Sequence, residues 1–255
     1  MELDTYLTAI ADCTTEITHV VEEDSLPLPV PTCPEWTINQ LLAHLGHVQS
    51  WAASVLRAAI VGEAVPPRPK EPAMLEEAPS GIARLDWLQG CTNGLMEALT
   101  TIEDETECWT FFPATSGRHF WARRQAHEAH LHLVDSELAV GRPIHPIPPS
   151  VAADGIAEAL TGYFARPGSN RSGREFPYRI AFEATDADSS WTIRVTDTSL
   201  EAVPRLEHAD LVINAPASAI FLLIWNRVDS SQLHSVGYAE LLDQWRASFQ
   251  GLYGR

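Results

Sequence analysis

The sequence predicts an α+β protein, with an N-terminal four-helix bundle followed by a smaller C-terminal α/β domain. Two observations carry this prediction. Apolar residues recur at helical spacing in four long segments before residue 142, whereas apolar and polar residues alternate at strand spacing after residue 176. Between these regions the chain is interrupted by Pro143, Pro146, Pro148 and Pro149. We therefore place a boundary at 142–150 and expect domains over 1–145 and 146–255.

Helices of the bundle are expected at 5–23, 38–62, 81–103 and 121–141. Thr37 is a suitable N-cap for the second helix, and Gly141 a suitable residue to end the fourth. The segment SLPLPVPTCP, between the first two helices, is too rich in proline to be helical throughout.

The C-terminal domain is expected to begin with a helix near 150–165. Two strands are predicted in PYRIAFEATD and SWTIRVTD, and a third, shorter one at Leu211–Asn214. The apolar run SAIFLLIWNR indicates a helix within 215–227, and LLDQWRASFQGLY indicates a closing helix.

Charge and composition exclude several classes of function. The 255 residues contain 34 acidic and 17 basic side chains, a net charge of -17, which disfavours nucleic acid and anionic membranes as partners. No apolar stretch is long enough to span a bilayer, and the acidic N-terminus lacks the features of a signal peptide. The four cysteines are scattered, and we expect reduced thiols in a cytoplasmic protein.

Histidines on the fourth predicted helix are the first indication of chemistry. Glu128 and His132 are four residues apart, so their side chains share one face of the helix. A histidine from a facing helix, such as His44, would complete a set of ligands suited to zinc or another first-row divalent ion. The same spacing also fits a surface pair, and His44 also fits a buried core position. His127 and His130 point to other sides of the helix and are expected to be outer-sphere or surface residues.

Three segments are distinctive as motifs: VPTCPEWTINQLLAHLGHVQSWA, FWARRQAHEAHLHLVDSELAVGRP and LVINAPASAIFLLIWNRVD. In this order they resemble the signatures of the mycothiol-dependent maleylpyruvate isomerase family, within the DinB-like metalloenzyme superfamily. The third segment has Asn226 where glycine is frequent in the family.

The resemblance implies a DinB-like bundle and a C-terminal α/β domain, similar to sterol-carrier folds, that covers the pocket. It also implies a divalent metal, with zinc as the first choice, bound by His44, Glu128 and His132. Arg227 matches an arginine that faces the pocket in the family. The thiol that the family uses is mycothiol, the low-molecular-weight thiol of actinobacteria.

The expected function follows from this ligand set. A metal ion with open positions can lower the pKa of a bound thiol, and the thiolate can add to a small electrophile, giving isomerisation or S-transfer. Arg227 is the expected catalytic residue. Arg123 and Arg124 are candidates for holding a cofactor or substrate carboxylate, and the alternative for both is a salt bridge to the acidic surface.

Two other functions stay open. The same scaffold could carry a metal-dependent hydrolase or lyase, or a protein that binds a small molecule without turnover. We expect a monomer or a homodimer whose partners are a small electrophile and a thiol. Asp135 and Glu137 are expected on the helix surface or between domains, although Asp135 is close enough to His132 in sequence to orient a neighbouring group.

Overall fold

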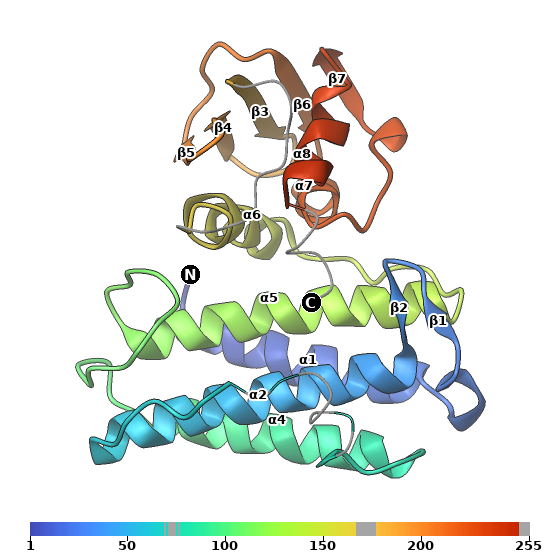
Figure 1. The fold of residues 1–255 in the computed structure, drawn as a ribbon, viewed down its shortest axis with the longest axis vertical. Coiled ribbons are helices and arrows are strands. Elements are labelled where there is room, and N and C mark those ends of the chain that lie inside the picture. The colour runs from blue at the N-terminus through green and yellow to red at the C-terminus, as the bar shows by residue number, and fades with distance from the viewer. Residues whose placement is uncertain (69, 71–74, 76, 167–176, 250–255) are drawn as a thin grey trace. The chain divides into compact units, whose positions relative to one another are not determined.

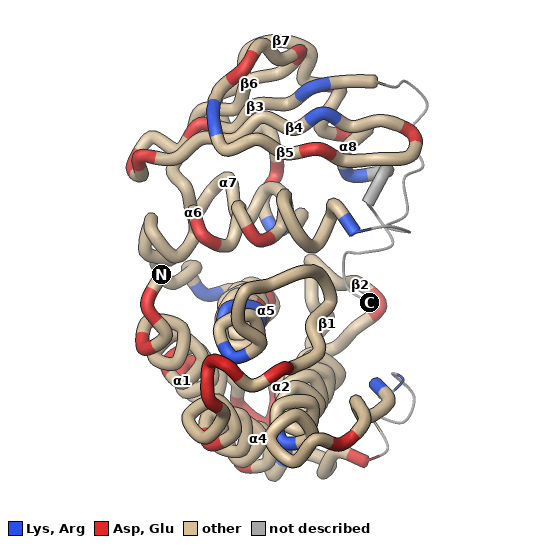
Figure 2. Tube along the Cα trace, turned by 90° about the vertical axis from the view of Figure 1, so that its left-hand side faces the viewer, with Lys and Arg blue, Asp and Glu red and all other residues tan. Residues whose placement is uncertain are grey.

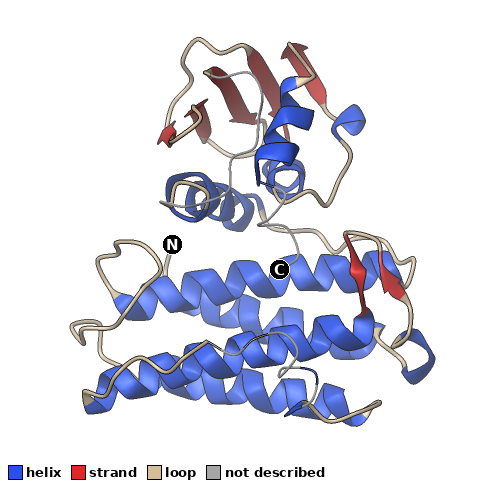
Figure 3. Ribbon diagram, viewed as in Figure 1, coloured by secondary structure: helices blue, strands red, loops and turns tan. Residues whose placement is uncertain are grey.

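The computed structural model describes the chain except for residues 69, 71–74, 76, 167–176 and 250–255. The chain divides into two compact units, Met1–His145 and Pro146–Arg255. Long helices make up most of the first unit, and the second combines shorter helices with a sheet (Figures 1 and 3). The predicted α+β class, a helical bundle followed by a mixed domain, is therefore confirmed.

Four long helices of the first unit lie side by side (Figure 1). They are α1 (Leu3–Val20), α2 (Ile38–Val61), α4 (Ala83–Thr101) and α5 (Gly117–Ala139). Helix α2 packs on α4, and α1 packs on α5. Helix α5 begins four residues before the predicted start, because the Ser116 hydroxyl accepts a hydrogen bond from the His119 backbone N–H, 3.3 Å away, and caps the helix there.

The ends of α2 and α5 have the expected caps. Thr37 forms a capping box with Gln40, whose side-chain oxygen accepts from the Thr37 N–H at 2.8 Å. Gly62 and Gly141 have φ values of 71° and 69°, and these left-handed residues end the two helices. Both helices that carry the candidate ligands are thus fixed in register at their ends.

The bundle core consists of two apolar clusters, one toward each end of the helices. One is built around the N-terminal part of α2 and includes Ile17, Val20, Leu41, Leu45 and Leu88. The other is built around the C-terminal part of α2 and includes Ile10, Trp51, Leu95, Leu99 and Trp121. Burial of these side chains is the main stabilisation of the bundle.

Gly46 lies where α2 crosses α4, and a substitution at this position tests how closely the two helices pack. A Cβ atom there would overlap the ring of Trp87. We expect Gly46→Ala to destabilise the protein by about 1–3 kcal/mol, the usual cost of overpacking. The matched control is Gly90→Ala in α4, where a Cβ meets open space and alanine favours the helix by up to about 1 kcal/mol. Urea unfolding of both variants measures the difference, and equal stabilities would contradict the close contact.

The proline-rich segment after α1 forms a short 3₁₀ turn, Glu23–Ser25, and then a small hairpin. Its strands are β1 (Pro29–Val30) and β2 (Cys33–Thr37), and they pair antiparallel. Thr32 lies in the turn of this hairpin, which packs against α5. The hairpin was not predicted, because strands this short and rich in proline carry no period-two pattern.

The described part of the second unit contains the α-helices α6 (Pro149–Glu158), α7 (Ala217–Ile224) and α8 (Leu241–Phe249). Helix α6 continues into one π-helical turn at Ala159–Tyr163. A short 3₁₀ turn spans Ser230–Gln232. The last residues of the predicted closing helix lie outside the described part of the chain.

The sheet of the second unit has the strand order β5-β4-β3-β6-β7. The strands are β3 (Tyr178–Ala184), β4 (Ser190–Val195), β5 (Leu200–Val203), β6 (Leu211–Ala215) and β7 (His234–Gly237). Neighbours are antiparallel except β3 and β6, which are parallel. Strands β3, β4 and β6 agree with the prediction, whereas β5 and β7 were not predicted.

Alternation along the central strands separates an apolar face of the sheet from a polar one. Ile180, Phe182 and Ile213 are buried, and α6 and α7 lie on one face of the sheet in both views (Figures 1 and 2). At the polar positions that alternate with these residues, the Asn214 amide of β6 donates to the Glu183 carboxylate of β3 at 2.7 Å. This arrangement explains why the strand pattern was visible in the sequence.

Asn226 follows the end of α7 with a φ of 61°. The Arg227 N–H donates to the Leu222 carbonyl at 2.7 Å, which closes the helix. Asparagine is among the residues that tolerate the left-handed conformation best after glycine. The replacement of glycine by Asn226 in the family motif is therefore compatible with the same helix end.

Candidate metal centre

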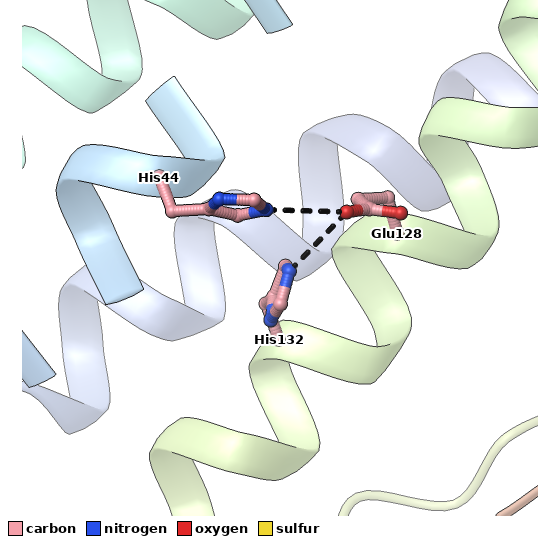
Figure 4. Close-up of side chains that lie close together, drawn as sticks. All are labelled: His44, Glu128 and His132. Atoms are coloured by element: carbon pink, nitrogen blue, oxygen red, sulfur yellow. Dashed lines mark ion pairs between the residues drawn. The ribbon is translucent and has the colours of Figure 1, made fainter. Parts of the chain in front are cut away.

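One histidine of α2 and a glutamate–histidine pair of α5 converge inside the first unit (Figure 4). The Glu128 Oε1 atom lies 3.5 Å from His44 Nε2 and 3.4 Å from His132 Nε2. One candidate ligand atom of each residue lies within 4.8 Å of the other two. Both histidines are buried, while the Glu128 side chain keeps 21% of its surface exposed. The cluster is thus held by the core and open on the side of the carboxylate.

Antiparallel packing of α2 against α5 creates this convergence. His44 meets Glu128, and seven residues further along α2 the Trp51 ring lies 5.4 Å from the Trp121 ring of α5. Trp121 precedes Glu128 by seven residues, so the two contacts are two helical turns apart on one face of each helix. The Trp36 ring of β2 packs on His44, with 4.6 Å between ring centroids.

The surroundings of the cluster favour an ionised Glu128 and a neutral His44. Burial raises the pKa of Glu128, but the nearby His132 and His44 rings and the Arg124 charge outweigh it and hold this pKa well below its usual range. Burial lowers the pKa of His44, which favours its neutral form. Burial also lowers the pKa of His132, but Asp135 and Glu128 outweigh it, and the net direction is upward.

Asp135 orients the His132 ring. Its Oδ2 lies 3.0 Å from His132 Nδ1, and its Oδ1 accepts a hydrogen bond from the Thr32 hydroxyl at 2.5 Å. Because a carboxylate only accepts, Nδ1 carries a proton, and Nε2 is the nitrogen that could bind a metal ion after losing its own proton. Asp135 is fully buried, so the expectation of a surface position was wrong, and its suggested orienting role fits the contacts.

Arg124 lies beside the cluster on α5. Its guanidinium donates to Glu128 Oε2 at 3.0 Å, and its side chain is 3% exposed. The alternative of a salt bridge therefore describes Arg124 best, although its partner is the candidate ligand Glu128 and not a surface acid. Arg123, the next residue, is half-buried.

The other histidines of these helices lie outside the cluster. His47 packs on Trp87, with 5.0 Å between ring centroids. His130 Nδ1 lies 3.0 Å from the Ala126 carbonyl. His127 faces the ring of Tyr6 at 6.3 Å. Both His127 and His130 are buried, so neither is a surface residue.

The donor set fits a divalent ion of the first transition row. Two imidazole nitrogens and one carboxylate oxygen are the ligand types of catalytic zinc sites. Within the described residues, no other group of three histidine, cysteine or acidic side chains has this spacing. A three-ligand site leaves positions open for water, a thiol or a substrate.

Arg227 lies in the second unit, directly after the end of α7. Its side chain is 7% exposed, and its guanidinium donates to the Trp225 carbonyl at 2.7 Å. A buried cation held by the backbone has a fixed position. The free thiols of Cys13, Cys33, Cys91 and Cys108 are consistent with the expected reduced state.

The helical bundle with its His–Glu–His cluster and the α/β unit that follows define a two-domain protein with a candidate metal centre. The model of the mycothiol maleylpyruvate isomerase N-terminal domain matches residues 7–137, and the model of the C-terminal domain of the same family matches residues 150–244. The chain therefore belongs to the mycothiol maleylpyruvate isomerase family, a family of enzymes, as the sequence motifs predicted.

Solved structures agree with this fold. A mycothiol-dependent maleylpyruvate isomerase with a histidine-to-alanine mutation aligns with a TM-score of 0.64 at 14% identity, covering 92% of this chain and 93% of that one. A second structure of a mycothiol-dependent maleylpyruvate isomerase gives 0.59 at 16% identity, with the same coverage. Among curated proteins no sequence matches this chain significantly. Of the described helices, none combines the length and the apolar character that a membrane span requires.

Proposed function

We propose that this chain is a divalent-metal-dependent enzyme that uses mycothiol to isomerise a small electrophile, or that transfers the mycothiol thiol to such an electrophile (S-transfer). The convergence of His44, Glu128 and His132 in a chain of this family is the observation that carries the proposal. Zinc is the proposed ion, because the ligands are two imidazoles and one carboxylate. We also propose a cytoplasmic location, which the free thiols support.

A bound divalent ion would lower the pKa of the thiol and hold the thiolate. His44 and His132 would supply neutral Nε2 donors, and Asp135 keeps the His132 proton on Nδ1. Arg124 stabilises the ionised form of Glu128. The thiolate of mycothiol would add to the carbon–carbon double bond of the electrophile. Rotation about the resulting single bond, re-formation of the double bond and loss of the thiolate would complete an isomerisation. Protonation of the intermediate carbanion by water would instead retain the thioether adduct, which is a transfer.

The test is metal analysis followed by an assay with mycothiol and maleylpyruvate. We expect about one ion per chain in the purified protein, and an isomerisation that needs both the thiol and the ion. Removal of the ion with a chelator should abolish turnover, and zinc should restore it. Turnover that needs neither the thiol nor the ion would contradict the proposal, as would hydrolysis of the substrate or binding without turnover.

We propose that Arg227 holds a carboxylate of the substrate, since its guanidinium has a fixed, buried position at the end of the family's C-terminal helix motif. Arg227→Gln is then expected to raise KM for maleylpyruvate by about 10-fold or more, the cost of a lost charged hydrogen bond. Metal content should be unchanged. Arg205→Gln, which removes an exposed arginine paired with Glu207, is the matched control. An Arg227 variant that folds and keeps wild-type KM would contradict this role.

A further inference from the structure

The loop after α2 carries an arginine to the same face of the bundle as the candidate metal centre. Trp51 of α2 donates its indole N–H to the Pro66 carbonyl at 3.0 Å. The Trp51 ring is 6% exposed and packed in the core. The hydrogen bond therefore fixes the loop to the buried Trp51 ring at Pro66, two positions before Arg68.

The Arg68 guanidinium lies over the face of this ring, with Cζ 5.8 Å from the ring centroid. Trp51 follows His44 by seven residues, so both side chains point from the same side of α2, two turns apart. Arg68 thus lies on this face of the bundle while it remains exposed to solvent.

Arg68 lacks a carboxylate partner among the described residues. Two other exposed or half-buried arginines of the first unit do have one, since Arg57 pairs with Glu97 and Arg118 with Asp104. The Arg68 guanidinium instead contacts the face of the Trp51 ring. In a chain with twice as many acidic as basic residues, an exposed guanidinium with no acid beside it in the described part of the chain is a candidate for binding an anionic ligand.

Further aromatic side chains pack around the Trp51 ring that lies under this arginine. The Trp51 ring lies 5.9 Å from Trp109 and 5.8 Å from Phe111, measured between centroids. Trp109 keeps 43% of its surface exposed. Such a wall can cover the carbon skeleton of a small acid, while the cation above it takes the carboxylate.

We propose that Arg68, held over Trp51, binds a carboxylate of the electrophilic substrate and selects anionic over neutral electrophiles. The choice of substrate class rests on the proposed function. The binding itself does not need turnover, so it can be tested separately. Nothing else in the catalytic proposal uses Arg68.

Maleate, a small dicarboxylate, is the probe, and dimethyl maleate is its neutral counterpart. We expect Arg68→Gln to weaken maleate binding by about 10- to 100-fold, the effect of losing a charge-assisted hydrogen bond. Binding of the diester should be unchanged. Arg68→Lys should recover part of the affinity, because a lysine keeps the charge but not the planar pair of donors. Arg57→Gln is the matched control, since it removes an equal charge from an exposed arginine paired with Glu97 on α4.

Calorimetry on the metal-free and the zinc-loaded protein distinguishes maleate binding at Arg68 from maleate binding to the ion. Loss of maleate affinity in both forms of Arg68→Gln supports the assignment. Unchanged affinity in that variant, no binding to the wild-type protein, or an equal loss in Arg57→Gln would overturn it. If maleate binding depends on Arg68 but no thiol-dependent turnover occurs, the Arg68 assignment stands and the proposed function fails.

Discussion

Replacing Glu128 with glutamine is expected to abolish tight binding of a divalent ion while the bundle remains folded. Glu128 Oε1 lies between the two histidine nitrogens, 3.5 Å and 3.4 Å away. It is the one ligand of the three that carries a negative charge. A neutral amide would leave two imidazoles to hold a dication, so affinity should fall by at least the 10- to 100-fold known for lost outer-sphere partners. Turnover with mycothiol should fall with it.

Stability should change little in this variant, because the glutamine oxygen can still accept the hydrogen bond of Arg124. Glu97→Gln, an exposed α4 acid paired with Arg57, is the matched control for the lost charge. Competition with a chromophoric chelator measures the affinity, and thermal unfolding of the metal-free protein measures the fold. Full metal content and activity in Glu128→Gln would mean that Glu128 is not a ligand.

The second large effect is expected for Asp135→Asn. An asparagine can keep a hydrogen bond to His132, but it removes the buried charge that makes the imidazole a stronger donor. We expect zinc affinity at pH 8 to fall by about 10- to 100-fold. The pKa of His132 in the metal-free protein should also fall, because Asp135 is one of the groups that raise it.

NMR titration of His132 distinguishes this role from simple damage to the fold. Thr32→Val is the companion variant, since it removes only the hydroxyl that donates to Asp135 from the hairpin. Its effect on affinity should be smaller and in the same direction. An unchanged His132 pKa together with unchanged zinc affinity in Asp135→Asn would show that this carboxylate does not act through the histidine.

Helices α1, α2 and α4 could be predicted because each has apolar residues at helical spacing, whereas α5, which also buries many polar side chains, was indicated by its length and its end at Gly141. Strands β3, β4 and β6 were visible because they alternate between a buried and a polar face. Strands β5 and β7 span four residues each, and most of the β7 positions are exposed, so neither has an alternation to detect. The β1–β2 hairpin depends on pairing across a proline-rich turn, which local periodicity does not report.

The candidate site was predictable in part. The spacing of Glu128 and His132 shows that they share a helix face, but only the resemblance to a family selected His44, because the pairing of α2 with α5 is a tertiary feature. Asp135 was misplaced on the surface because its partner Thr32 is 103 residues away. Arg68 has no motif, and only the contact with Trp51 places it on this face of the bundle.

If a metal ion binds as proposed, the preassembled triangle of His44, Glu128 and His132 would make its loading an exchange of cations. In the metal-free protein the carboxylate is already ionised and His44 already favours its neutral form, whereas the raised pKa of His132 lets it keep a proton. A proton on His132 Nε2 would have to leave before that nitrogen could bind an ion. Acidification is therefore expected to weaken metal binding, because protons compete with the ion for the same three side chains.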